Sequence, residues 1–388
     1  MHFEHILRSS QFQLSDLNYI FSLADKIRNF NYTKQGLLWL RSLLPHKRAM
    51  LFFSQPSTRT FLSFQSACHI LGMQTSEIRD PSTSSEKKGE SIEDSMRTFS
   101  SYVDLIIMRS ASPGLCERIA DVLDNTKSWV PIINAGSGPD EHPTQALLDL
   151  YTLQRGFKND TRLLSKLAVE NKVLGDAERR TAMCTLVHED SCTASTTQFA
   201  STVEFGKKSN GINGKTICMV GDLKRGRTVR SLSHLLTHYT DVKIIFVSPP
   251  AFSIPDDLRA FLQNASNVKF FETTDFINAI TEADAIYMTR IQDEYDDLDP
   301  SLKNIDTTQY HLKHEHLTLL KPTCKILHPM PRRQEIDIKI DHDLRAEYWN
   351  QQRNGMWIRT ALIAILLNVA TEIMAYSQAA QTPKIYSE

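Results

Sequence analysis

The segment Ser57-Thr-Arg-Thr60 has the side chains to bind a phosphorylated anion. It follows a short apolar run, residues 49–53, that reads as a buried strand, and it precedes apolar residues at helical spacing. Ser57 is a good N-cap, so the next three residues should form the first turn of a helix. That turn offers backbone N–H groups, two hydroxyls and a guanidinium, which suit a phosphate or an acyl phosphate. A capped helix with a surface Arg59 also explains this segment when it is read alone.

Further polar clusters along the chain suit the same chemistry. Most follow an apolar run directly, and the exception is a polar loop that carries Lys87-Lys-Gly-Glu90. Ligands of parallel α/β sheets bind beyond the carboxyl ends of the strands, so this shared position predicts one active site for an anion. Taken singly, His142 could be a packed loop histidine, and the other charged residues could be solvated surface charges. Arg290, directly after a strand, is harder to explain in that way. The clusters that follow apolar runs are Arg109, His142-Pro-Thr-Gln145, Gly226-Arg-Thr-Val229, Thr289-Arg-Ile-Gln292 and His328-Pro-Met-Pro-Arg332.

The elements that must position these clusters alternate between strands and helices. The pattern restarts after residue 214, which predicts an α/β protein of two doubly wound, parallel-sheet, Rossmann-like domains with the active site between them. A length of 388 residues agrees with two domains. Ser15 and Asp16 should cap the first helix. Strands are expected at 49–53, 103–108, 130–134, 215–220, 242–247, 283–288 and 324–327, and helices at 14–30, 37–44, 91–102, 146–154 and 228–238.

The composition predicts a soluble, globular, cytoplasmic protein. The chain is 41% hydrophobic and 23% charged, and its 44 Lys and Arg nearly balance 45 Asp and Glu. This balance gives no global attraction to nucleic acid or to an anionic membrane. The longest apolar segment, residues 361–370, is too short to span a bilayer. Six cysteines without a C-x-x-C pair favour a reducing compartment over disulfides or structural zinc.

Read in register, these motifs resemble the catalytic chain of the aspartate transcarbamoylase family. The resemblance covers nearly the whole chain except residues 156–213, which therefore look like an insertion of unknown role. It implies a carbamoyl-phosphate-binding domain at 1–147, completed by the returning segment 348–388, and an aspartate-binding domain at 148–347. It also implies a homotrimer with shared active sites, and it leaves open whether regulatory chains or nucleotides control the enzyme.

The implied reaction transfers the carbamoyl group of carbamoyl phosphate to L-aspartate, without cofactor or metal. Its products would be N-carbamoyl-L-aspartate and phosphate, in the committed step of de novo pyrimidine biosynthesis. Carbamoyl phosphate would be bound by Ser57, Thr58, Arg59, Thr60, Ser84, Arg109, His142, Gln145, Pro329 and Met330. Aspartate would be bound by Lys88, Arg227, Arg290 and Gln292. The catalytic residues would be Arg59, Thr60, Lys88, Arg109 and His142, with Ser84 and Lys88 supplied by the adjacent chain.

Several positions depart from the family pattern. Gln55 and Tyr295 stand where charged residues commonly help lock the closed domains, so the means of closure is left open. Phe61 replaces a usual basic residue. Met330 replaces a usual leucine, which matters little if its backbone carbonyl makes the contact.

The nearest alternative is an ornithine or other amino-acid transcarbamoylase, which shares the phosphate half of the site. Those enzymes usually carry cysteine where this chain has Thr144 and Pro329, and they lack two arginines aimed at a dicarboxylate. A catalytically silent paralogue that binds carbamoyl phosphate or a partner chain is a second alternative, disfavoured by the intact Arg59, Lys88, Arg109 and His142. An NAD-binding protein is disfavoured because no G-x-G-x-x-G follows a strand.

Overall fold

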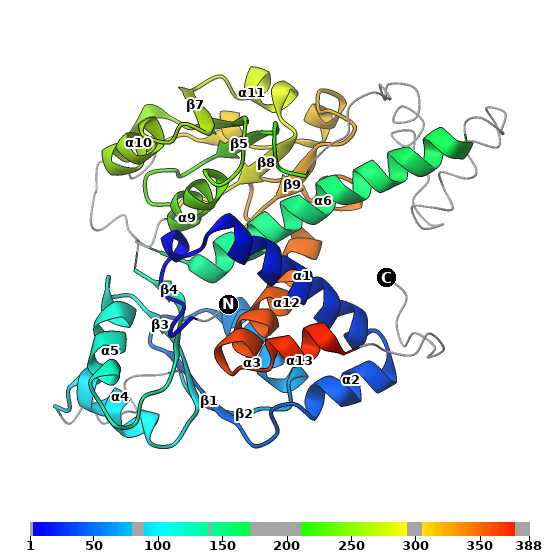
Figure 1. Ribbon diagram of the computed structural model, residues 1–388. Coiled ribbons are helices and arrows are strands. Elements are labelled where there is room, and N and C mark those ends of the chain that lie inside the picture. The colour runs from blue at the N-terminus through cyan, green and yellow to red at the C-terminus, as the bar shows by residue number, and fades with distance from the viewer. Residues whose placement is uncertain (1–2, 80–88, 139–140, 171–210, 293–304, 377–388) are drawn as a thin grey trace. The chain divides into compact units, whose positions relative to one another are not determined.

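The computed structural model describes residues 3–79, 89–138, 141–170, 211–292 and 305–376, with side chains omitted for 159–170. Ser84, Lys87, Lys88 and Tyr295 lie outside the described residues. The chain divides into two compact units (Figure 1). Unit 1 comprises Met1–Leu148, Arg227–Leu235 and Gln352–Glu388, and unit 2 comprises Asp149–Gly226 and Leu236–Gln351.

Unit 1 contains a four-stranded parallel sheet in the order β2-β1-β3-β4. Its central strands are almost entirely apolar and buried, as expected of a sheet that is covered on both faces. The strands are β1 (Arg48–Phe53), β2 (Gln74–Ile78), β3 (Leu105–Ser110) and β4 (Ile132–Ser137), and the helices that follow them include α3 (Thr58–Ile70), α4 (Ile92–Ser100) and α5 (Leu115–Asp124).

Helices from both ends of the chain pack together in unit 1 (Figure 1). They are α1 (Leu14–Asn31), α2 (Lys34–Arg41), α12 (Tyr348–Leu366) and α13 (Ala370–Ala375). The ring of Trp39 stacks on that of Tyr376, with centroids 3.9 Å apart. The predicted cap of α1 was wrong. Gln13 is the N-cap, and Asp16 lies inside the helix, where its carboxylate accepts a hydrogen bond from the Gln13 N–H at 2.8 Å.

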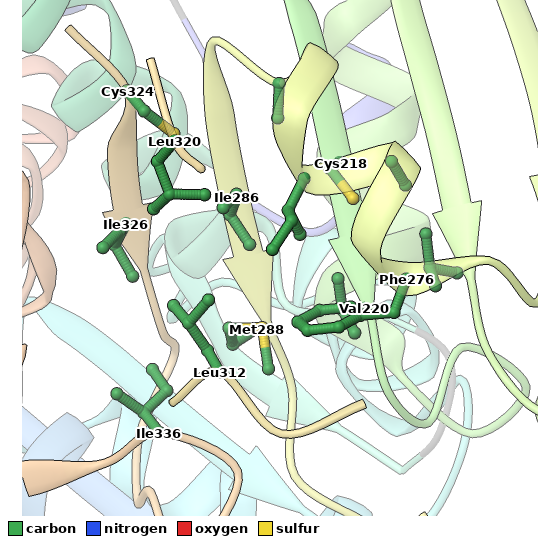
Figure 2. Packing of buried hydrophobic residues seen from close by; sticks show 14 of the residues in the cluster. Cys218, Val220, Phe276, Ile286, Met288, Leu312, Leu320, Cys324, Ile326 and Ile336 are labelled. Carbon is green, nitrogen blue, oxygen red and sulfur yellow. The ribbon is translucent and has the colours of Figure 1, made fainter. Parts of the chain in front are cut away.

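Unit 2 contains a five-stranded parallel sheet in the order β7-β6-β5-β8-β9. Figure 2 shows Val220, Met288 and Phe276 packed against one another in the buried cluster on one face of this sheet. The strands are β5 (Thr216–Val220), β6 (Val242–Val247), β7 (Val268–Thr273), β8 (Ala285–Met288) and β9 (Lys325–Leu327), and the helices include α10 (Asp256–Gln263) and α11 (Phe276–Glu282). Short 3-10 helices are Ser9–Gln11 in unit 1 and Pro250–Phe252, Thr308–Tyr310, His314–Thr318 and Ile338–His342 in unit 2.

The two parallel sheets confirm the predicted fold class. Helix α6 (Pro143–Glu170) is longer than predicted, and α9 (Arg227–Leu236) clusters with unit 1 over most of its length. Strand β2, strand β7 and helices α5, α10 and α11 were not predicted. None of the described helices combines the length and the apolar character needed to cross a membrane.

Candidate active site

The carboxyl edge of the unit 1 sheet carries the predicted phosphate-binding turn. Helix α3 begins at Thr58 with Ser57 as its N-cap, as predicted. The Ser57 side chain makes no capping hydrogen bond, whereas the hydroxyl of Thr33, the N-cap of α2, accepts one from the Gly36 N–H at 3.0 Å. The first turn of α3 therefore has N–H groups that its cap does not satisfy. Thr58 and Arg59 are exposed in this turn and Thr60 is buried.

Arg109 lies at the same edge because Phe53, the last residue of β1, pairs with it in the sheet register. The sequence placed Arg109 just after a strand, but β3 begins and ends later than predicted and includes it. Arg109 is 7% exposed, and its Nη1 donates a hydrogen bond to the Ala135 carbonyl at 3.1 Å.

Gly136 brings Arg109 and His142 together. Its φ is +116°, and a Cβ built there would lie 2.6 Å from Arg109 Nη1 and 3.2 Å from His142 Cδ2. The two side chains thus converge on a backbone position where only glycine fits. A guanidinium and an imidazole side by side can both donate hydrogen bonds to an oxygen that gains negative charge.

His142 is held neutral by its surroundings. It is 4% exposed, and burial together with the charges of Arg227, Arg109 and Arg359 holds its pKa well below the ordinary imidazole value. Its Nδ1 is buried and has no hydrogen-bond partner in the described part of the chain. A neutral ring carries one N–H, and no partner among these residues fixes which nitrogen holds it.

A hydrogen-bond network that was not predicted fixes the His142 backbone. The His142 N–H donates to Ser231 Oγ at 3.3 Å, and that hydroxyl donates to Glu141 Oε2 at 2.7 Å. Ser9 Oγ donates to the same carboxylate oxygen at 2.8 Å. Arg227 is the first residue of α9, and its Nη1 donates a hydrogen bond to the Gly138 carbonyl. The network joins residues far apart in sequence. Only Glu141, which directly precedes the motif histidine, could have been predicted from the sequence to lie near the site.

Gln145 occupies the first turn of α6. Pro143 starts this helix, a position that suits proline because the first N–H of a helix has no intrahelical partner. Gln145 is 6% exposed, and its N–H donates to the His142 carbonyl at 3.0 Å. Unit 1 contains these predicted site residues: Ser57, Thr58, Arg59, Thr60, Arg109, His142, Gln145 and Arg227.

The carboxyl edge of the unit 2 sheet carries Arg290 and Gln292 just after β8. Both are half-buried. The Gln292 N–H donates to the buried carboxylate of Asp222 at 3.2 Å, and Arg290 Nη1 donates to the Ile291 carbonyl at 2.8 Å. Asp222 also accepts from Arg225 Nε at 2.7 Å. Asp222 thus anchors two loops at this edge and was not singled out from the sequence.

The loop after β9 carries Pro329 and Met330, and His328 organises it. His328 Nδ1 accepts from the Met330 N–H at 2.8 Å, while Nε2 lies 2.7 Å from Glu335 Oε1. Burial lowers the pKa of His328 despite the nearby carboxylate. Burial is the largest influence on the Glu335 pKa and would raise it, but the hydrogen bond and charge of His328 and two backbone hydrogen bonds together lower that pKa. Met330 takes a left-handed backbone conformation with φ of 60°.

The described residues hold no group of three or more His, Cys, Asp or Glu side chains that could bind a metal ion. Ser84 and Lys88, predicted to come from an adjacent chain, lie outside these residues.

Comparisons with known proteins agree with the two units. Residues 4–155 match the carbamoyl-P binding domain of aspartate/ornithine carbamoyltransferases, and residues 213–366 match the Asp/Orn binding domain. The aspartate carbamoyltransferase catalytic subunit of Clostridium novyi is 35% identical over 366 residues, covering 94% of this chain and 98% of that protein. Aspartate carbamoyltransferase 1 of Pisum sativum, a chloroplastic protein, is 33% identical over 94% of this chain and 78% of its own length.

Solved structures give the same result. The catalytic subunit of M. Jannaschii aspartate transcarbamoylase has a TM-score of 0.71 and 30% identity, covering 94% of this chain and 98% of that one. Aspartate transcarbamoylase from Trypanosoma cruzi, in complex with carbamoyl phosphate and aspartate, has a TM-score of 0.73 and 27% identity over 92% and 95% of the chains. With both domains matched and a 35% identical relative covered over 98% of its length, this chain belongs to the aspartate/ornithine carbamoyltransferase family.

Proposed function

We propose that this chain transfers the carbamoyl group from carbamoyl phosphate to the amino group of L-aspartate. The products are N-carbamoyl-L-aspartate and phosphate, in the committed step of de novo pyrimidine biosynthesis. The observation that carries the proposal is the neutral His142 beside the Arg109 guanidinium at Gly136. The names of the relatives, aspartate carbamoyltransferases, support aspartate as the acceptor.

The reaction needs positioning and charge stabilisation more than an enzyme nucleophile. The aspartate amine attacks the carbamoyl carbon, and the carbonyl oxygen becomes an oxyanion. That intermediate collapses by breaking the bond between the carbamoyl carbon and the bridging phosphate oxygen, and a proton of the attacking amine passes to the departing phosphate. His142, Arg109 and Thr60 donate to the developing oxyanion, where one such donor is worth roughly 10²–10³-fold in rate.

The remaining roles follow from charge and shape. Ser57, Thr58, Arg59, Thr60 and Arg109 bind the phosphoryl oxygens, and Gln145 with the backbone carbonyls of Pro329 and Met330 binds the carbamoyl NH₂. Guanidinium groups match carboxylates bidentately, so Arg227 and Arg290 suit the two carboxylates of aspartate better than lysines would. Gln292 completes the aspartate contacts. Ser84 and Lys88 of a neighbouring chain complete the site.

Selectivity for the acceptor tests this function. Phosphate release from carbamoyl phosphate should depend on L-aspartate, because Arg227 and Arg290 bind carboxylates and ornithine has only one. L-Ornithine at the same concentration should give no rate above the spontaneous hydrolysis of carbamoyl phosphate. Equal rates with the two amino acids would contradict aspartate as the substrate. An enzyme active only with ornithine would be the alternative family member.

The domain and assembly assignments belong to the same proposal. Residues 1–147 with 348–388 bind carbamoyl phosphate, residues 148–347 bind aspartate, and the chain acts in the cytoplasm as a homotrimer with shared sites. The grouping of Gln352–Glu388 with the first 148 residues supports the first of these assignments.

A mixing experiment tests the shared sites. Arg59→Ala and Lys88→Ala should each be nearly inactive, because each site needs Arg59 of one chain and Lys88 of the neighbouring chain. Trimers reassembled from equal amounts of both should regain about one quarter of the sites by random assortment. No recovery after mixing, with trimers formed, would show that each site is built within one chain.

A further inference from the structure

Arg79 lies at the same sheet edge as the proposed phosphate site. Strand β2 pairs in parallel with β1, and Ile78 is the register partner of Phe52. Arg79 is one residue beyond Ile78 and therefore lies beside Phe53, whose partner on the other side is Arg109. Neighbouring strands are about 4.8 Å apart, so the Cα atoms of Arg79 and Arg109 are roughly 10 Å apart across β1. The register thus places one arginine on each side of the strand that leads into α3.

An aromatic ring holds the guanidinium of Arg79 in place. Its Cζ lies 4.5 Å from the centroid of the Phe61 ring, in the first turns of α3. Phe61 is 3% exposed and packs edge-to-face against Phe53, with centroids 5.4 Å apart. A cation over an aromatic face is attracted to it, so the stacking restricts an otherwise exposed side chain. Arg79 is therefore oriented before any ligand binds.

A cavity of about 330 Å³ opens at this point. Phe53, Pro56, Ser57 and Arg79 line it. Its size is at the lower end of the range for small-molecule sites, about 300–1,000 Å³. Among the described residues that line it, the polar side chains are those of Arg79 and of Ser57, whose hydroxyl makes no capping hydrogen bond. No ion pair between described residues involves Arg79.

We propose that Arg79 is a further substrate-binding residue, which contacts the phosphoryl group of carbamoyl phosphate from the side of β1 opposite Arg109. The carbamoyl end of the substrate is uncharged, whereas phosphoryl oxygens match the fork of a guanidinium. Ser57, which lines the cavity, already belongs to the phosphate-binding turn in the proposed function. The inference rests on that function for the identity of the substrate. The inference that an anion binds beside Arg79 rests only on the cavity and on the stacking of Arg79 on Phe61.

The test compares Arg79→Gln with the wild-type full-length chain and with Arg353→Gln. Arg353 is an exposed arginine of unit 1 that also lies over an aromatic ring, 5.9 Å from the centroid of Tyr32, but it does not line the cavity. Calorimetric titration with inorganic phosphate measures anion binding without turnover, and steady-state assays measure KM for each substrate. Thermal melts confirm that the variants are folded.

Arg79→Gln should weaken phosphate binding and raise KM for carbamoyl phosphate by about 10-fold each, since a charged hydrogen bond is lost. KM for aspartate should stay within about twofold of wild type. Arg79→Lys should bind phosphate more weakly than wild type but more tightly than Arg79→Gln. Arg353→Gln should match wild type. Unchanged phosphate affinity in folded Arg79→Gln, or a change confined to KM for aspartate, would overturn the inference. If the wild type transfers no carbamoyl group, weaker phosphate binding by Arg79→Gln would still support the anion site while the proposed function fails.

Discussion

His142 in unit 1 and His328 in unit 2 are both buried and have the same sequence context, but their rings differ in hydrogen bonding. Each precedes a proline near the carboxyl end of a strand, and each is at most 4% exposed. Burial is the main cause of a lowered pKa in both, so both rings are neutral near pH 7. A buried neutral imidazole can either serve the fold or remain available to a ligand.

The hydrogen bonds decide between these uses. Both ring nitrogens of His328 are engaged, one by the Met330 N–H and one by Glu335. This arrangement places the proton on Nε2 and fixes the backbone of Met330. His142 instead has a buried Nδ1 with no partner in the described part of the chain, and charged arginines around it. The Nδ1 of His142, free of partners within the described ranges, is what the proposed contact with substrate requires, whereas His328 has no such capacity left.

Replacing His142 should give the largest effect on catalysis. His142→Ala is expected to lower kcat roughly 10²–10³-fold, because it removes a donor to the oxyanion. Its free energy of unfolding should fall by only about 1–2 kcal/mol, since mainly packing is lost. Steady-state kinetics and urea unfolding on the same preparation measure both.

His328→Ala is the matched control, because it leaves a cavity of the same size in the other unit. It should lose about 2–3 kcal/mol more stability than His142→Ala, since the buried carboxylate of Glu335 loses a hydrogen bond. Its kcat should fall less than that of His142→Ala. The reverse ranking, with His142→Ala less stable but more active than His328→Ala, would contradict a structural role for His328 and a catalytic role for His142.

The pH dependence of stability gives a smaller effect. Both folded-state pKa values are lowered, so below about pH 6.5 the unfolded chain takes up protons that the folded chain does not. Stability should therefore fall as pH falls from 7.5 to 5.5, by up to about 1.4 kcal/mol per pH unit for each histidine. Urea unfolding across this range should show a shallower slope in either alanine variant, more so for His142→Ala. Slopes identical to wild type would mean that these rings titrate in the folded protein as they do in the unfolded chain.

The sequence predicted the parts of the fold where local pattern and burial agree. Val242–Val247 is apolar almost throughout and became β6 with the predicted bounds, and Ser57 opened α3 where the N-cap chemistry indicated. Strand β2 was missed because Gln74–Ile78 is a largely exposed edge strand with no apolar alternation. The same lack of pattern hides Arg79, although Phe61, on which it stacks, departs from the family pattern.

The interactions that support the site could not be predicted for a different reason. Glu141, Ser231 and Ser9 meet only in the folded chain, and nothing in the spacing of these residues shows that they share a hydrogen-bond network. The same holds for Gly136, whose need to be glycine is set by Arg109 and His142. The motifs therefore predict candidate substrate-binding residues, whereas the side chains that support those residues are identified only from the structure.

Product analysis tests the central claim most directly. Purified full-length chain is incubated with ¹³C-labelled carbamoyl phosphate and L-aspartate, and the products are followed by ¹³C NMR alongside a phosphate assay. N-carbamoyl-L-aspartate should form in a one-to-one ratio with the phosphate released above spontaneous hydrolysis, and both should form roughly 10²–10³-fold more slowly in His142→Ala. Phosphate released at the same rate with and without aspartate, and no labelled carbamoyl-aspartate, would contradict it.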